Sequence, residues 1–154
     1  MAERARIVEP SLYDRDFAAW SEEQGRLLRA RSRSDLDWDN LAEEIETLGR
    51  SERSEIRSRL VILLQHLLKW EHQPERRKTG WRASILDARD QLNEQIEASP
   101  SLKAYPAAIL PRQYELARLR ASDETGLPMD RFPPDCPYSL ADILNDAFFP
   151  GRAD

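Results

Sequence analysis

The stretch LAEEIETLGRSERSEIRSRLVILLQHLLKW, residues 41–70, decides the fold of this chain. Apolar residues recur along it three and four positions apart, which is the period of an amphipathic helix. Acidic residues crowd its first turns, where negative charge suits the helix macrodipole, and Pro74 stops it just beyond His72. The pattern predicts a helix of about thirty residues, roughly 50 Å long, that begins after Asp37 or Asp39.

One point of this helix is open to two interpretations. Gly49 would suit a C-cap and Ser51 a new N-cap, which would divide the stretch into two helices. We favour one helix, because the apolar period continues on both sides.

Three ionisable residues fall on the apolar side of the predicted helix. Glu52, Arg59 and His66 are spaced seven apart and share one stripe of roughly 120° with apolar neighbours. Buried charges must be paired or they destabilise the fold. One interpretation is a polar network at the edge of the core, and Glu55 is an alternative partner for Arg59 one turn away. The other is a ligand pocket, in which Arg59 fixes an anion and His66 exchanges protons.

The other predicted helices follow cap and proline signals. We expect the first to start after Asp14 as its N-cap and to run to about Arg31. The others are expected from Thr79 or Gly80 to Ser99, over 112–125, and from Ser139 through Asn145. Pro106 and Pro111 argue against an earlier start for the fourth. The expected fold is therefore all-α: a helical bundle of about four main helices with a long central second helix and a short C-terminal helix. We expect a single domain over residues 1–154, with residues 1–12 as a candidate flexible arm.

Aromatic and apolar residues mark the expected core. Trp38, Trp70 and Trp81 are predicted core or core-edge anchors, and the two phenylalanines at 148–149 are expected to pin the tail. The first helix should turn one inner face to the core, made of Phe17, Trp20, Gln24, Leu27 and Leu28.

Composition limits the function classes. The formal net charge of −5 argues against non-specific nucleic-acid binding, because a phosphate backbone rewards a positive field. The single cysteine cannot form an internal disulfide, which favours a reducing compartment. The N-terminus has no signal core, and the most apolar run, 60–68, is too short to span a membrane. We therefore expect a cytoplasmic protein without membrane association.

Patterns for catalysis or metal binding are weak. Leu63 and Lys69 stand three residues before the two histidines, where a di-iron bundle would need glutamate. The histidines lie on different faces, and no cysteine pair is present. We expect no metal and no cofactor. Cys136 sits beside Asp135 in a proline-rich link, so a buried anchor is a better interpretation than a nucleophile.

A basic turn follows the long helix. Its cations are Lys69, Arg76, Arg77, Lys78 and Arg82, and they alternate with Trp70 and Trp81. Cations interleaved with aromatic rings can hold single-stranded nucleic acid. We favour tryptophans that pack between helices and cations that sit at a helix C-terminus. The acidic stretch 35–48 is either a solvated helix start or a docking face for a basic partner.

Several ordered motifs resemble a known family. They are YDRDFAAW at 13–20, LAEEIETLGRSER at 41–53, HLLKW at 66–70, QPERR at 73–77, WR at 81–82, SPSL at 99–102 and CPY at 136–138. Together they resemble the bacterial family catalogued as domain of unknown function number twenty-nine, over roughly 12–149. The resemblance implies an all-helical cytoplasmic domain and brings no activity, cofactor or catalytic residue.

These observations favour a non-enzymatic helical interaction module that works as a homo-oligomer or as an adaptor for a protein partner. The first alternative is a small-anion-binding or enzymatic bundle that uses Glu52, Arg59 and His66. The second is a nucleic-acid-associated accessory protein. An exposed apolar patch would favour the interaction module. An enclosed cavity at Glu52, Arg59 and His66 would favour the small-anion-binding bundle. An uncovered Trp70 or Trp81 would favour the nucleic-acid-associated protein.

Overall fold

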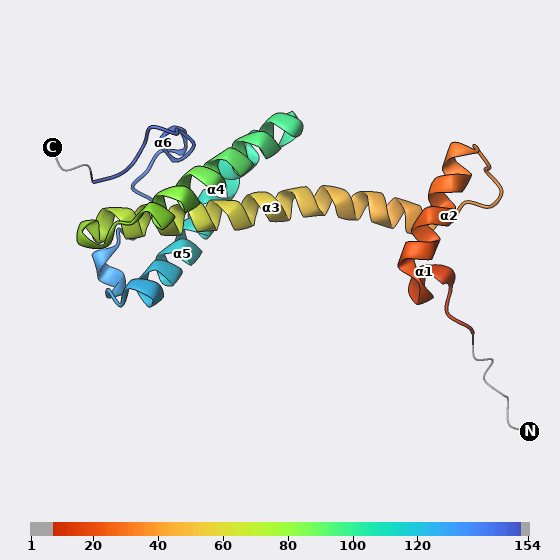
Figure 1. Cartoon of the computed structure of the whole chain (residues 1–154), viewed down its shortest axis with the longest axis horizontal. Helices are drawn as coiled ribbons and strands as arrows, with labels where there is room; N and C mark the ends of the chain where they lie inside the picture. Colours follow the sequence, from red (N-terminus) through yellow and green to blue (C-terminus); the bar gives the residue numbers. More distant parts are fainter. Residues whose placement is uncertain (1–7, 152–154) are drawn as a thin grey trace, which may run out of the picture. The chain divides into compact units, whose positions relative to one another are not determined.

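The computed structural model describes residues 8–151, and its regular structure is entirely helical within that range. The six α-helices are α1 (Leu12–Arg15), α2 (Phe17–Arg29), α3 (Trp38–His72), α4 (Thr79–Ala98), α5 (Tyr105–Thr125) and α6 (Leu140–Ile143) (Figure 1). Short 3₁₀ turns lie at Pro74–Arg76, Pro100–Leu102 and Met129–Arg131. The all-α prediction, with a long helix in the middle of the chain, is confirmed.

Helix α3 is continuous through Gly49, as expected. The chain nevertheless divides at this residue into two compact units. Unit 1 comprises the residues up to Gly49, and unit 2 comprises those from Arg50 onward. That the whole chain behaves as a single domain stays a prediction, and residues 1–7 of the expected arm lie outside the described residues.

Unit 2 contains a well-packed core. The second half of α3 supplies seven buried apolar residues, which are Ile56, Leu60, Val61, Leu63, Leu64, Leu67 and Leu68. Helices α4 and α5 cover them with Ile85, Leu92, Tyr114 and Ala117 (Figure 1). Trp81 is buried and Trp70 packs half-buried against the core, as predicted.

The C-terminal segment of unit 2 is held by arginines. Arg89 is fully buried, and its guanidinium donates hydrogen bonds to the carbonyls of Ile143 (2.8 Å) and Phe148 (2.5 Å). Arg118 donates in the same way to Phe132 (3.2 Å). A chain that lacks regular structure must find donors for its carbonyl groups, and these side chains supply them. Phe149 is buried against Trp70 with ring centroids 5.1 Å apart, so the expected pinning of the tail is confirmed.

Unit 1 is a helical hairpin with a small buried core. Asp16 caps α2 by accepting from the Ala19 amide (3.0 Å). Asp37, just before α3, accepts from Trp20 Nε1 (3.0 Å) and Asn40 Nδ2 (2.8 Å). The Asn40 hydrogen bond is the main reason that the pKa of Asp37 lies below its usual value.

The start of the first predicted helix was wrong in detail. Instead of one helix that starts after Asp14, a four-residue helix α1 ends at Arg15 and α2 begins at Phe17, because Asp16 is the cap. Only part of the predicted inner face is buried. Trp20, Gln24 and Leu27 are buried, whereas Phe17 and Leu28 remain half exposed.

Two further expectations were wrong. Trp38 is no core anchor: it is exposed, and its indole Nε1 donates to the Arg33 carbonyl (3.4 Å). Helix α5 starts at Tyr105 and passes through both prolines. Pro106 occupies the first turn, where its missing N–H removes no helical bond. Pro111 and the residue four positions before it are exposed, so water can reach the carbonyl left without a helical donor.

Candidate functional site

The three ionisable residues of α3 are half-buried and point to different partners. Glu52 accepts from Gln95 Nε2 on α4 (3.3 Å). The Arg59 guanidinium lies 3.5 Å from Glu55, one turn before it on the same helix. Glu52 lines a shallow acidic depression with Glu94, and neither Arg59 nor His66 contributes to that lining. The side chains of the three residues therefore contact different groups, and a ligand site at these residues stays a prediction.

His66 makes a local contact instead. Its Nδ1 donates to the Ile62 carbonyl one turn earlier (2.8 Å). Burial lowers the pKa of His66, and the Lys69 ammonium nearby acts in the same direction. The neutral imidazole is therefore the favoured form in the folded protein.

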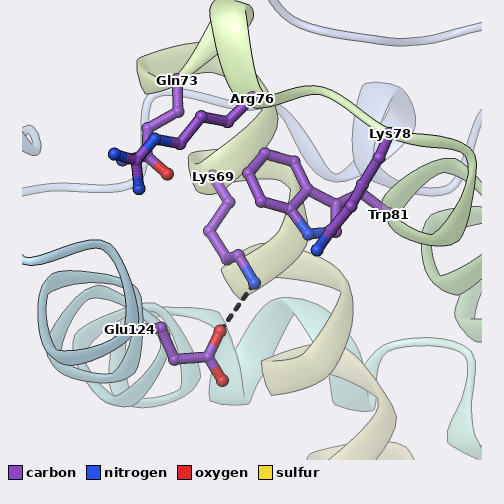
Figure 2. Close-up of a pocket in the computed structure, with 6 residues that line it drawn as sticks. All are labelled: Lys69, Gln73, Arg76, Lys78, Trp81 and Glu124. Atoms are coloured by element: carbon purple, nitrogen blue, oxygen red, sulfur yellow. Dashed lines mark hydrogen bonds and ion pairs between the residues drawn. The ribbon is translucent and has the colours of Figure 1, made fainter.

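The basic turn, by contrast, forms a cavity in unit 2 of about 570 Å³. Six residues line it, which are Lys69, Gln73, Arg76, Lys78, Trp81 and Glu124 (Figure 2). They come from the end of α3, the following 3₁₀ turn, the start of α4 and the end of α5. The break after His72 therefore brings three cations to one place.

The cavity walls are held by charge and aromatic contacts. Lys69 Nζ lies 2.7 Å from Glu124 Oε2, and the Lys69 side chain is only 11% exposed. The same ammonium lies 4.7 Å from the centroid of the Trp81 ring, and Lys78 Nζ lies 5.6 Å from it. The hydrogen bond from Lys69 lowers the pKa of Glu124, so this carboxylate stays ionised at neutral pH.

The other two predicted cations of the turn lie elsewhere. Arg77 donates to the carbonyls of Trp70 (2.8 Å) and Gly151 (2.8 Å), so it holds the C-terminal segment. The Arg82 guanidinium lies 4.9 Å from the Phe149 ring centroid. The five cations therefore divide into three that line a cavity and two that support the fold.

Unit 1 carries a second concave surface, an apolar groove of about 380 Å³ between α2 and the first turns of α3. Its lining residues are Phe17, Trp20, Ser21, Gln24, Gly25, Leu28, Leu41, Glu44, Ile45 and Leu48. Ile45 and Leu48 are each 68% exposed. A neighbouring hollow of about 460 Å³ is lined by Ser21, Glu22, Gly25, Arg26 and Arg29.

Other candidate chemistry finds little support. Cys136 is half-buried, its Sγ lies 3.5 Å from the Tyr138 carbonyl, and burial raises the pKa of the thiol, which disfavours the reactive thiolate. Within residues 8–151, no group of three or more His, Cys, Asp and Glu side chains is arranged to hold a metal ion. No helix of the described chain has both the length and the apolar character to cross a bilayer.

The sequence analysis did not identify some of the important residues. Gln73 and Glu124 complete the cavity but lie outside the basic motif, and Glu124 is 55 residues from its partner Lys69. Arg89 carried a usable signal, because it stands four residues after Ile85 and three before Leu92 on an apolar helix face. An arginine in that position predicts a buried cation with specific acceptors.

Fold and surfaces together define an all-helical protein with a cationic cavity in one unit and an apolar groove in the other. The chain belongs to the family described as domain of unknown function DUF29, whose model matches residues 12–149. The resemblance seen in the motifs is thereby confirmed. None of the curated proteins and none of the solved structures matches this chain.

Proposed function

We propose that this protein is a non-enzymatic helical interaction module that self-associates through unit 1. Two copies would pack their α2–α3 hairpins into one four-helix bundle. The main support is the apolar groove, whose rim residues Phe17, Leu28, Ile45 and Leu48 are 48–68% exposed. Contiguous exposed apolar surface of this kind marks interaction sites in proteins.

The small interior of unit 1 supports the same proposal. Within residues 8–49 its buried residues are Trp20, Gln24 and Leu27, and the first twelve residues of α3 contribute none. A segment of this size rarely buries enough apolar surface to be stable without a disulfide, a metal or oligomerisation. Covering the groove would stabilise the hairpin.

Gly25 favours a helix as the occupant. It lies in the middle of α2, where glycine costs about 0.5–1 kcal/mol relative to alanine. Apart from its chain neighbours and the backbone of its own helix, no atom of the described residues comes within 4 Å of the Cβ that alanine would place there, and its φ is not left-handed. The open space beside Gly25 and Ser21 would let a second helix approach closely, with helix axes 8–10 Å apart as an order of magnitude.

A second copy suits the charges around this surface. Arg26 and Arg29 border the hollow at the basic end of α2, and Glu44 borders the groove on α3. A two-fold axis makes each patch meet its counterpart on the other copy. It can therefore place the basic end of one α2 against the acidic flank of the other α3, while Ile45 and Leu48 fill the space at Gly25.

The experiment is sedimentation equilibrium of the full chain over about 1 to 100 µM. The wild type should be a dimer within this range, and Ile45→Glu should be a monomer with unchanged helicity, because it places a charge in the groove. Gly25→Leu should also give a monomer, by blocking close approach. The matched control is Leu119→Glu, a change at an exposed leucine of α5, which should leave the dimer intact. A wild type that stays monomeric throughout the range would overturn the proposal.

A further inference from the structure

We propose that the cavity of unit 2 lined by Lys69, Arg76 and Lys78 is a binding site for a phosphate-bearing small molecule. This site does not depend on self-association, since all its residues belong to unit 2.

The charge of the cavity supports an anionic ligand. Three cations face one carboxylate, Glu124, which gives a local net charge of 3 − 1 = +2 in a chain whose formal net charge is −5. Among residues 8–151, neither Arg76 nor Lys78 has a carboxylate within ion-pairing distance. Two cations without a counter-ion at one cavity attract an anion from solution.

Gln73 provides an independent observation. It lines the cavity, and its side-chain amide has no hydrogen-bond partner among the described residues, so its polar atoms are open to solvent or to a ligand. An amide that is open to a cavity can exchange its hydrogen bonds to water for hydrogen bonds to a bound molecule. In the view of Figure 2, the Gln73 amide and the Arg76 guanidinium extend toward the same side of the cavity. A ligand oxygen there would satisfy the amide N–H and the guanidinium together.

The ligand class follows from the shape of these donors. A guanidinium presents a planar fork that matches two oxygens of a phosphoryl group, and an ammonium adds a point charge to a third. Arg76 and Lys69 would hold the phosphoryl oxygens, and Lys78 would lie at the edge of the site. The volume of about 570 Å³ lies in the range of small-molecule pockets and leaves room for more than one phosphoryl group.

Nucleic acid fits the cavity less well. Single-stranded nucleic acid stacks its bases on uncovered aromatic rings. Trp81 is only 9% exposed, and the ammonium groups of Lys69 and Lys78 lie against its ring. The ring therefore orients cations and is not free to stack a base.

The first experiment is calorimetric titration of the full chain with inorganic phosphate and with pyrophosphate, at constant ionic strength set by chloride. We expect saturable binding, with pyrophosphate tighter than phosphate because it offers more oxygens. Arg76→Gln should weaken binding by roughly tenfold or more, since hydrogen bonds to charged groups have about this effect. The matched control is Arg112→Gln, an exposed arginine of α5 paired with Glu115, which should leave binding unchanged. Absence of saturation with both ligands, or equal weakening by both variants, would overturn the proposal.

Glu124→Gln provides a test in the opposite direction. It raises the local charge to +3 and frees the Lys69 ammonium, so pyrophosphate should bind several-fold more tightly. If Glu124 only supported the fold, the variant would bind equally or more weakly. Circular dichroism of the same sample confirms that the variant is folded. An oligonucleotide that binds with steep salt dependence while pyrophosphate does not bind would also overturn the proposal, because it would make the surface a nucleic-acid site.

Discussion

The two halves of helix α3 show how differently one amphipathic helix can be used. Its second half, in unit 2, buries eight residues between Ile56 and Leu68, and most of these are fully inaccessible. Its first half, in unit 1, buries none, although Leu41, Ile45 and Leu48 continue the apolar period. The period of a helix predicts which face is apolar, and the neighbouring elements decide whether that face is covered.

The two units also differ in how they use charge. In unit 2, arginines donate to backbone carbonyls of the C-terminal segment, as Arg77, Arg89 and Arg118 do. In unit 1, Arg26 and Arg29 line a hollow at the surface. We therefore expect unit 2 to carry the stability of the protein and unit 1 to gain order from a partner.

The comparison is tested most strongly by removing one leucine from each half of α3. Leu64→Ala should lower the free energy of unfolding by about 2–5 kcal/mol, because it leaves a cavity in a closed core. Leu48→Ala, the matched change in unit 1, should cost less than about 1 kcal/mol when the protein is monomeric. Urea unfolding at low protein concentration gives both values.

Protein concentration gives a second test of the same two variants. The cost of Leu48→Ala should grow with protein concentration if Leu48 is buried between two copies, whereas the cost of Leu64→Ala should not. If both variants lowered the free energy of unfolding equally at low protein concentration, the contrast between the buried half of α3 in unit 2 and its exposed half in unit 1 would be contradicted.

The next largest effect should come from Arg89. Arg89→Met keeps a long apolar stem but removes the donors to the carbonyls of Ile143 and Phe148, so unfolding should become easier by roughly 2–3 kcal/mol. The same change at the exposed Arg112 should stay within about 0.5 kcal/mol. Thermal unfolding followed by circular dichroism measures both. A near-zero effect at Arg89 would mean that water or a shifted chain replaces these bonds without loss.

Much of the helical pattern could be predicted from the sequence because local signals determine it. Continuity through Gly49 followed from the period on both sides, and the end of α5 followed from Gly126, which takes the left-handed conformation (φ 71°). The error at Pro111 has a tertiary cause. The missing hydrogen bond is tolerated because that turn faces solvent, and no local signal reveals which turn does.

The surfaces could be predicted only in part. The basic turn was visible as a motif. Which of its cations line the cavity and which support the fold depends on where Arg77 and Arg82 contact the C-terminal segment. The exposure of Trp38 was missed because residue type predicts burial only on average. Contacts between residues far apart in the chain, such as Lys69 with Glu124, have no signature in a single sequence.

The smallest expected effect is the change in protein stability when His66, at the edge of the unit 2 core, becomes protonated. Burial, helped by Lys69 and opposed by the Ile62 carbonyl and by Glu124, puts the pKa of His66 below the ordinary value of 6.5. Above pH 6.5 the imidazole is neutral in both the folded and the unfolded chain, so its contribution to stability is complete there. As the pH falls below 6.5, the unfolded chain takes up a proton before the folded one does, and stability is lost down to the folded pKa. Because His66 is only half-buried, the loss should stay below about 1 kcal/mol.

His66→Gln should remove this part of the pH dependence, as measured by urea unfolding at about pH 7.5 and about pH 5.5. If the variant and the wild type lost the same free energy between these two values, His66 would be as solvated as a side chain in the unfolded chain, and the edge of the unit 2 core would be open like the groove of unit 1.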